Sequence, residues 1–276
     1  MKKKVLTISL AIVFLAVLSV AFFFVYTDRP ALAEDTDTVW DGSTIATSFS
    51  GGNGTKENPY LIKNGEELAF LKKVLDEGQA DGYKSLYYEL TADINLGSHD
   101  LGQIGQKVPF SGYFDGKGHV IKNVALTGKA DSEKDNYYGL FGNVDNAKIS
   151  NLTINGMKIM ITGSGKIYLG TLAGKINNEE KEDNTISNIL IKNIDIDLTG
   201  IEIAKESKIA TFIGEIGKGY KINNIMLLGE AKSNYEDAFT LSSSIESDLN
   251  KIVYNVKSEV ITQNGEVKED SKIENI

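Results

Sequence analysis

From Tyr87 onward the chain consists of short apolar segments rich in Ile, Val, Leu and Tyr, separated by Gly, Asn and Asp. Segments of this length and composition, bounded by turn residues, are typical of β-strands. The same small motifs recur along this region, and recurrence at intervals of 20–50 residues indicates a repeat architecture. We therefore expect an all-β solenoid.

The first repeated motif is Ile-x-Asn followed by an aliphatic residue, with a further aliphatic residue two positions later. Its asparagines are Asn123, Asn151, Asn188 and Asn224, at intervals of 28, 37 and 36 residues. The Ile and the next aliphatic residue are three positions apart. Inward-facing residues of a straight strand are separated by even steps, so both can face one core only if the chain turns between them.

The asparagine of this motif is predicted to form the turn, because Asn tolerates the left-handed backbone conformation better than most residues. Successive turns would then stack, and their amides would hydrogen-bond from coil to coil as a ladder. The predicted ladder is Asn123, Asn151, Asn188 and Asn224. Hairpins are the alternative, but they predict regularly spaced two-residue turns, and the chain lacks that spacing.

A second repeated motif has the form apolar, x, Gly, x, aliphatic. It occurs at Leu140–Val144, Leu172–Ile176 and Phe212–Ile216, and each copy precedes one of the last three Asn motifs. The two motifs together predict a right-handed parallel β-helix with roughly four coils, enough to bury a continuous core.

One soluble helix is predicted, over residues 65–77. Leu68, Leu71, Val74 and Leu75 recur at helical spacing, Asn64 can cap the start, and Gly78 can end the helix. Because one such helix cannot bury its apolar face alone, we expect it to cap the open end of the β-helix. The single tryptophan, Trp40, is expected to pack against the first coil.

The N-terminus has the layout of a secretory signal. Lys2, Lys3 and Lys4 precede an apolar run over residues 5–26, and Ala31-Leu32-Ala33 offers a small-residue cleavage site. We expect cleavage after Ala33, with an uncleaved signal-anchor as the alternative, because the run approaches the length that spans a bilayer. The expected organisation is a signal over 1–33, a linker over 34–50, a β-helix domain over 51–262 and a flexible tail over 263–276.

The repeats resemble the GLUG-motif β-helix family of exported bacterial proteins, and similar segments precede the catalytic domain of immunoglobulin-A1-cleaving metallopeptidases. The matching segments are Gly51–Ile62, Leu90–Leu96, Phe110–His119 and Gly139–Gly142. The resemblance covers about residues 40–228 and implies an extracellular or cell-surface β-helix. It implies no activity, because such segments accompany many functions. The later repeats keep only the last glycine of Gly-Leu-Phe-Gly.

Composition excludes several classes of function. The chain has 29 basic and 38 acidic residues, and removal of residues 1–33 leaves 25 and 37, a net charge of −12. Such a surface repels nucleic acid, which is therefore not an expected partner. There is no cysteine, so disulfides and thiolate metal sites are excluded, and Arg29 is the only arginine, so a mature chain has no guanidinium chemistry.

The residues that a catalytic mechanism needs are sparse. His99 and His119 lie 20 positions apart and cannot form a zinc peptidase motif, so both are interpreted as structural or loop residues. A carboxylate-based polysaccharide hydrolase remains the alternative; its candidate carboxylates are Asp93, Asp115, Asp195 and Asp197. We expect Asp93 and Asp115 to fix turns, and Asp195 and Asp197 to share a solvated strand face. No cofactor is expected, with calcium at acidic positions as the alternative.

The preferred interpretation is a non-catalytic surface module that binds a glycan or a surface protein, or acts as a scaffold. Its candidate binding residues are four tyrosines interpreted as exposed: Tyr137, Tyr138, Tyr168 and Tyr220. Packing in the core or at an edge of the β-helix is the alternative for each of them. Membrane contact is expected only through residues 5–26, if that segment is retained.

Overall fold

The computed structural model describes residues 38–77, 82–177, 184–233, 240, 242–243, 248–261 and 267–275. These residues belong to one compact unit, Asp37–Ile276. The predicted signal segment, with the apolar run over 5–26 and the cleavage site at Ala33, lies outside the described residues. Among the described residues, no helix has the length and apolar character needed to cross a membrane.

The described unit contains one α-helix and sixteen strands, in the order β1 (Tyr60–Ile62), α2 (Gly65–Asp76), β2 (Tyr87–Leu90), β3 (Ile94–Asn95), β4 (Tyr113–Asp115), β5 (Val120–Ala130), β6 (Asn136–Tyr138), β7 (Phe141–Asp145), β8 (Lys148–Gly165), β9 (Ile167–Leu169), β10 (Ala173–Asn177), β11 (Asn184–Ile203), β12 (Lys208–Ile209), β13 (Ile213–Ile216), β14 (Tyr220–Ser233), β15 (Asp248–Ile261) and β16 (Val267–Asn275).

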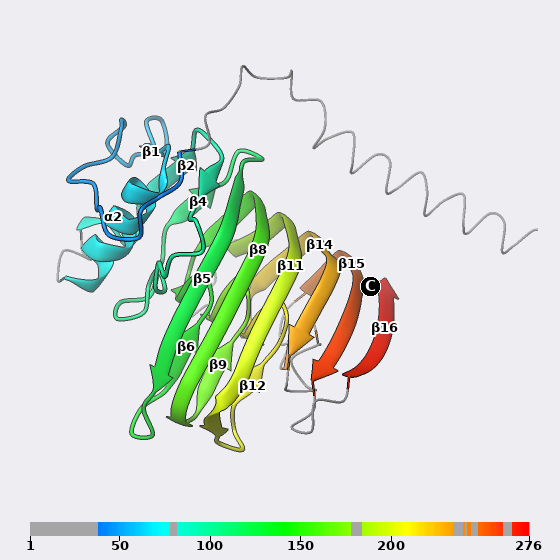
Figure 1. Cartoon of the computed structure of the whole chain (residues 1–276). Coiled ribbons are helices and arrows are strands. Elements are labelled where there is room, and N and C mark those ends of the chain that lie inside the picture. Colours follow the sequence, from blue (N-terminus) through cyan, green and yellow to red (C-terminus); the bar gives the residue numbers. More distant parts are fainter. Residues whose placement is uncertain are drawn as a thin grey trace, which may run out of the picture. The chain divides into compact units, whose positions relative to one another are not determined.

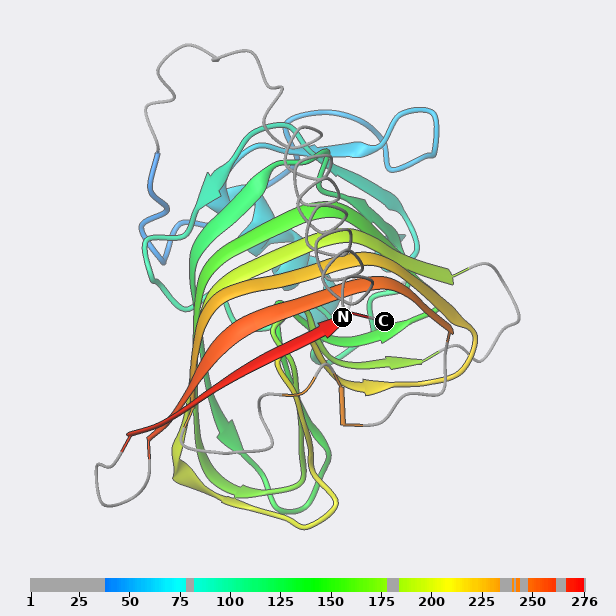
Figure 2. The same ribbon diagram turned by 90° about the vertical axis from the view of Figure 1, so that its right-hand side faces the viewer.

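The strands form three walls of a right-handed parallel β-helix, which confirms the predicted fold class. The long wall is one sheet with the strand order β1-β2-β4-β8-β11-β14-β15-β16, in which β5 also pairs with β8 and β3 pairs with β5 (Figure 1). Two short walls have the strand orders β12-β9-β6 and β13-β10-β7. From β5 to β14, each coil therefore runs through one long strand and two short ones, as the view along the axis shows (Figure 2). The walls enclose one continuous apolar core.

The Ile-x-Asn motif forms a corner in the long wall. Asn151 has φ of 54°, while Ile149 and Leu152 on either side of the turn are fully buried. Asn188 and Asn224 have φ of 56° and 53° and occupy equivalent positions. The left-handed asparagine thus lets two residues at an odd separation face the same core, as the motif predicted.

The predicted asparagine ladder is correct for three residues and wrong for Asn123. The Asn224 amide donates to Asn188 Oδ1 over 2.9 Å, and the Asn188 amide donates to Asn151 Oδ1 over 2.8 Å. The next position in this column is Asp115, which accepts from the Asn151 amide over 2.9 Å.

Asn123 belongs to a second column at a second corner, because Lys122 and Val124 pair with Asn155 and Met157. There the Asn123 amide donates to Asn95 Oδ1 over 3.0 Å. The long wall bends twice per coil, so an Ile-x-Asn sequence does not by itself reveal which corner it occupies.

The second motif marks the fold between the two short walls. Phe141, Ala173 and Ile213 are register partners, as are Val144, Ile176 and Ile216, which confirms the predicted alignment. A Cβ on Gly174 would lie 2.6 Å from the carbonyl oxygen of Tyr168 and 2.8 Å from that of Gly142. Only glycine allows the two walls to approach this closely.

The helix α2 ends at Asp76, one residue before the predicted Glu77, and Gly78 lies outside the described residues. Asn64 accepts from the Glu67 amide over 3.0 Å and caps the helix as predicted. Leu68, Leu71 and Leu75 are fully buried in the core at the N-terminal end of the β-helix. The helix therefore covers apolar surface that the first strands would otherwise expose (Figure 1).

Two terminal segments contain more structure than the predicted linker and tail, and Trp40 packs on the β-helix as predicted. Within the predicted linker, Trp40 is 6% exposed, and its indole nitrogen donates to the Thr44 carbonyl over 2.7 Å. Its backbone nitrogen donates to Asn95, so this segment packs on the β-helix. The predicted flexible tail instead contains β16, which pairs antiparallel with β15. The paired residues run from Val253 opposite Asn275 to Ile261 opposite Val267. Backbone pairing can hold a charged segment that has no apolar pattern of its own.

Candidate binding surface

Three of the four tyrosines proposed for binding are buried, so the prediction that they are exposed is wrong. Tyr138 and Tyr220 are 2% and 1% exposed, and both belong to the core. The Tyr220 hydroxyl oxygen accepts from the Ala147 amide over 3.2 Å, and burial raises its pKa above the ordinary range. Burial raises the pKa of Tyr138 to about 12. Neither ring is available to a ligand.

Tyr137 and Tyr168 are brought together on the outer side of the β6-β9 wall. Their rings stack with centroids 5.1 Å apart and an interplanar angle of 20°. Lys166 Nζ and Lys175 Nζ lie 4.7 and 4.9 Å from the centre of the Tyr168 ring. The lysines and Tyr137 cover Tyr168, which is only 4% exposed. Tyr137 is the one residue of the predicted set that is partly exposed.

A second stacked pair, Tyr87 and Tyr113, lies on the outer face of the long wall and was not predicted. The residues are register partners on β2 and β4, and their ring centroids are 4.1 Å apart with an interplanar angle of 5°. Lys148, the next residue in this row, places its Nζ 5.4 Å from the centre of the Tyr113 ring. Both tyrosines are partly exposed. Burial, followed by a hydrogen bond to Tyr113, raises the pKa of Tyr87.

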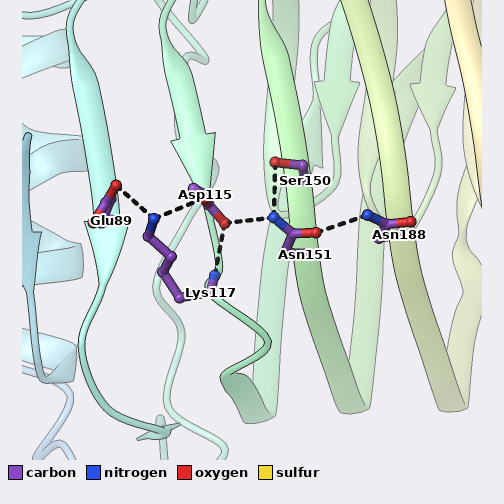
Figure 3. A network of polar contacts seen from close by, with 6 residues as sticks. All are labelled: Glu89, Asp115, Lys117, Ser150, Asn151 and Asn188. Carbon is purple, nitrogen blue, oxygen red and sulfur yellow. Dashed lines mark hydrogen bonds and ion pairs between the residues drawn. The ribbon is translucent and has the colours of Figure 1, made fainter. Parts of the chain in front are cut away.

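A charged row lies beside this pair, two residues further along the same strands. Lys117 Nζ is 2.8 Å from Glu89 Oε1 and 3.3 Å from Asp115 Oδ2 (Figure 3). The hydrogen bond to Glu89 is the main reason that the pKa of Lys117 is raised. Asp115 also accepts the Lys117 amide over 2.8 Å and so fixes this turn, as predicted. Together, Tyr87, Tyr113, Lys148 and this charged row form what we call the tyrosine platform.

The sequence does contain a signal for the tyrosine platform. Tyr87-Tyr88-Glu89 and Tyr113-Phe114-Asp115 share the order tyrosine, aromatic residue, acid. The central aromatic residues, Tyr88 and Phe114, are each 1% exposed. Alternation along the strand then turns the tyrosine and the acid outward. Only the register of β2 with β4 reveals that Tyr87 lies beside Tyr113 and that the two acids lie beside each other.

The carboxylates of the hydrolase alternative lie on an outward strand face, as predicted. Asp195 and Asp197 alternate with the buried Ile194, Ile196 and Leu198. Asp195 Oδ2 is 3.9 Å from Lys158 Nζ. Asp197 accepts from the backbone and hydroxyl of Thr199, and these bonds lower its pKa. A glycosidase acid needs a raised pKa, so the environment of Asp197 opposes that role.

The remaining polar candidates hold local structure. Asp93 Oδ1 accepts the Val120 amide over 3.0 Å and lies 3.0 Å from His119 Nδ1, consistent with the predicted turn-fixing role of Asp93 and structural role of His119. The His99 amide donates to the Leu96 carbonyl in a loop, and its ring meets Trp40 edge-on. Within the described part of the chain, no three His, Asp or Glu side chains gather at a metal-binding distance.

Comparison with known proteins finds two relatives, each similar to about half of this chain. A "Putative Gly-rich membrane protein" of Evansella cellulosilytica is 33% identical over 141 residues, which are 48% of this chain and 15% of that protein. "Halomucin" of Haloquadratum walsbyi is 33% identical over 141 residues, which are 49% of this chain and 1% of that protein. The matched region is thus a small part of each relative. No family model matches the chain, and no solved structure matches it.

Proposed function

We propose that this protein is an exported, non-catalytic β-helix module of the cell surface that binds a glycan or a surface protein through the tyrosine platform. The repeats' resemblance to the GLUG-motif family and the signal-like N-terminus support export. The names of the two relatives, a membrane protein and a halomucin, agree with a surface location.

The observation that carries the proposal is the stacked, partly exposed pair Tyr87–Tyr113 on the outer face of the long wall. Tyrosines supply broad amphipathic contact area at a small cost in conformational entropy, because each has only two side-chain torsions. Here the strand register, the mutual stacking and Lys148 already hold the rings in place. Binding of a ligand therefore costs little further side-chain conformational entropy.

The chemistry around the rings suits a polar ligand with many hydroxyl or amide groups. Glu89 and Asp115 offer acceptors and Lys117 offers a donor, all within the network of Figure 3. The tyrosine rings contribute apolar surface and hydroxyls at one edge of this network. Such a combination of aromatic surface and a few fixed polar groups is typical of ligand sites.

The test is a glycan array and a cell-wall pull-down with the purified protein and the variant Tyr87→Ala/Tyr113→Ala. We expect binding by the wild type and at least a tenfold loss of affinity in the variant. The matched control is Met160→Ala, which removes a side chain from the same long wall where it is 40% exposed. Binding that survives loss of both tyrosines, with circular dichroism unchanged, would contradict the platform as the site.

A further inference from the structure

Three reactive groups occupy one column on adjacent strands of the β13-β10-β7 wall. Lys175 on β10 is the register partner of Asn143 on β7 and of Glu215 on β13. Lys175 Nζ lies 2.7 Å from Glu215 Oε1, and the two side chains are 19% and 21% exposed. An amine, a carboxylate and a carboxamide are thus held on successive coils of the solenoid.

The surroundings of this column shield it partly from solvent. The Tyr168 ring, stacked on Tyr137, lies 4.9 Å from Lys175 Nζ. Asn143 Oδ1 is buried and has no hydrogen-bond partner among the described residues. A buried carbonyl oxygen without a donor is unfavourable by about 1–3 kcal/mol, so its persistence in a well-packed wall calls for an explanation.

We propose that Lys175 and Asn143 form an intramolecular isopeptide bond, with Glu215 as the group that transfers the protons. Neighbouring strands lie about 4.7–4.9 Å apart, a separation that the four-carbon stem of lysine can bridge by folding toward the adjacent residue. The parallel register keeps the amine and the amide facing the same side of the wall. Confinement of two reactants in this way replaces a bimolecular encounter.

The reaction balances without any further reactant. Glu215 accepts a proton from the Lys175 ammonium, and the neutral amine attacks Cγ of Asn143. The new bond between Nζ and Cγ forms and the bond between Cγ and Nδ2 breaks. Glu215 gives the first proton to the leaving nitrogen and accepts the second proton that Nζ loses on becoming an amide. The products are one secondary amide and ammonia, which takes the remaining proton from Glu215 and leaves as ammonium. Burial of Lys175 lowers its pKa and the bond to Glu215 raises it, with a net rise. The amine is therefore held as an ammonium ion paired with Glu215, and Glu215 is also the base that accepts its proton.

The bond would join two consecutive coils covalently in a chain without cysteine. Solenoid coils contact only their neighbours, so they can separate one interface at a time. A link between β7 and β10 would oppose that separation in the middle of the described unit.

The test is the intact mass of the full-length gene product after denaturation, compared with the sequence mass for its measured N-terminus. We expect the wild type to be lighter by one ammonia, and Lys175→Arg and Glu215→Gln to have the full sequence mass. Peptide mapping of the wild type should yield one branched peptide that joins β7 and β10. Lys175→Arg keeps the positive charge, so we expect it to fold. Circular dichroism checks that it does.

Two results would overturn the proposal. One is a wild-type mass equal to the sequence mass. The other is an ammonia loss that persists in Lys175→Arg, which would place the event elsewhere. Peptide mapping separates the proposed link from cyclisation at Asn155-Gly156, which also releases ammonia but joins no second strand.

Discussion

The side-chain amide of Asn188 donates to Oδ1 of Asn151 over 2.8 Å, and both residues have the left-handed backbone conformation, with φ of 56° and 54°. One residue type thus serves two purposes at the corner. Its backbone makes the turn, and its amide joins one coil to the next.

Replacement of Asn188 by alanine should therefore remove both contributions. Two ladder hydrogen bonds, to Asn151 and from Asn224, are lost at about 1 kcal/mol each. The left-handed conformation costs alanine about 1–2 kcal/mol more. We expect a loss of about 3 kcal/mol in urea unfolding. Glycine tolerates positive φ, so Asn188→Gly should lose only the two hydrogen bonds, about 2 kcal/mol. Equal losses in the alanine and glycine variants would contradict the backbone part of the argument.

Gly174→Ala should destabilise the fold between the two short walls. The added Cβ would lie 2.6 Å from the Tyr168 carbonyl oxygen and 2.8 Å from the Tyr138 nitrogen, and backbone atoms cannot move aside cheaply. We expect a loss of at least about 2 kcal/mol. The matched control is Gly82→Ala, where a Cβ meets nothing within 4 Å. Thermal denaturation of both variants measures the difference, and an unaffected Gly174 variant would refute the close approach.

Alkaline pH should unfold the protein through its buried tyrosines. Burial raises the pKa of Tyr138 from 10.0 to about 12 in the folded protein. As pH rises, Tyr138 therefore loses its proton at a lower pH in the unfolded chain than in the folded protein. The folded state is therefore stable below pH 10, and its stability falls as pH rises from 10 through 12. Tyr138→Phe should leave stability at pH 7 nearly unchanged and shift the alkaline midpoint upward. Circular dichroism followed against tyrosinate absorbance checks this, and an unshifted midpoint would count against it.

The hydrolase alternative makes a separate prediction at Asp195 and Asp197. Because bonds from Thr199 lower the pKa of Asp197, we expect this carboxylate to be ionised near neutral pH and unable to donate a proton to a glycosidic oxygen. Release of reducing sugar from cell-wall polysaccharide should be absent in the wild type and in Asp195→Asn/Asp197→Asn alike. Release by the wild type that disappears in the double variant would establish an enzyme and reverse the functional proposal.

The sequence by itself determined the fold class and the local geometry. The odd spacing in Ile149-Ser150-Asn151-Leu152 requires a turn between two inward residues, and Asn favours the conformation that makes it. Asn64 and the apolar spacing of α2 likewise specify a helix from neighbouring residues alone. These features depend on contacts within a few positions, so the pattern is sufficient to predict them.

The tertiary structure alone decided which residues share a column and which side chains reach solvent. Coils differ in length, because loops between walls vary, so the sequence spacing did not place Asn123 at the second corner or align Tyr87 with Tyr113. Tyr168 alternates outward from its strand, yet Lys166, Lys175 and Tyr137 cover it from other segments. Register and burial arise from contacts between distant segments, and the sequence predicted them only where a motif repeats at equivalent positions of successive coils.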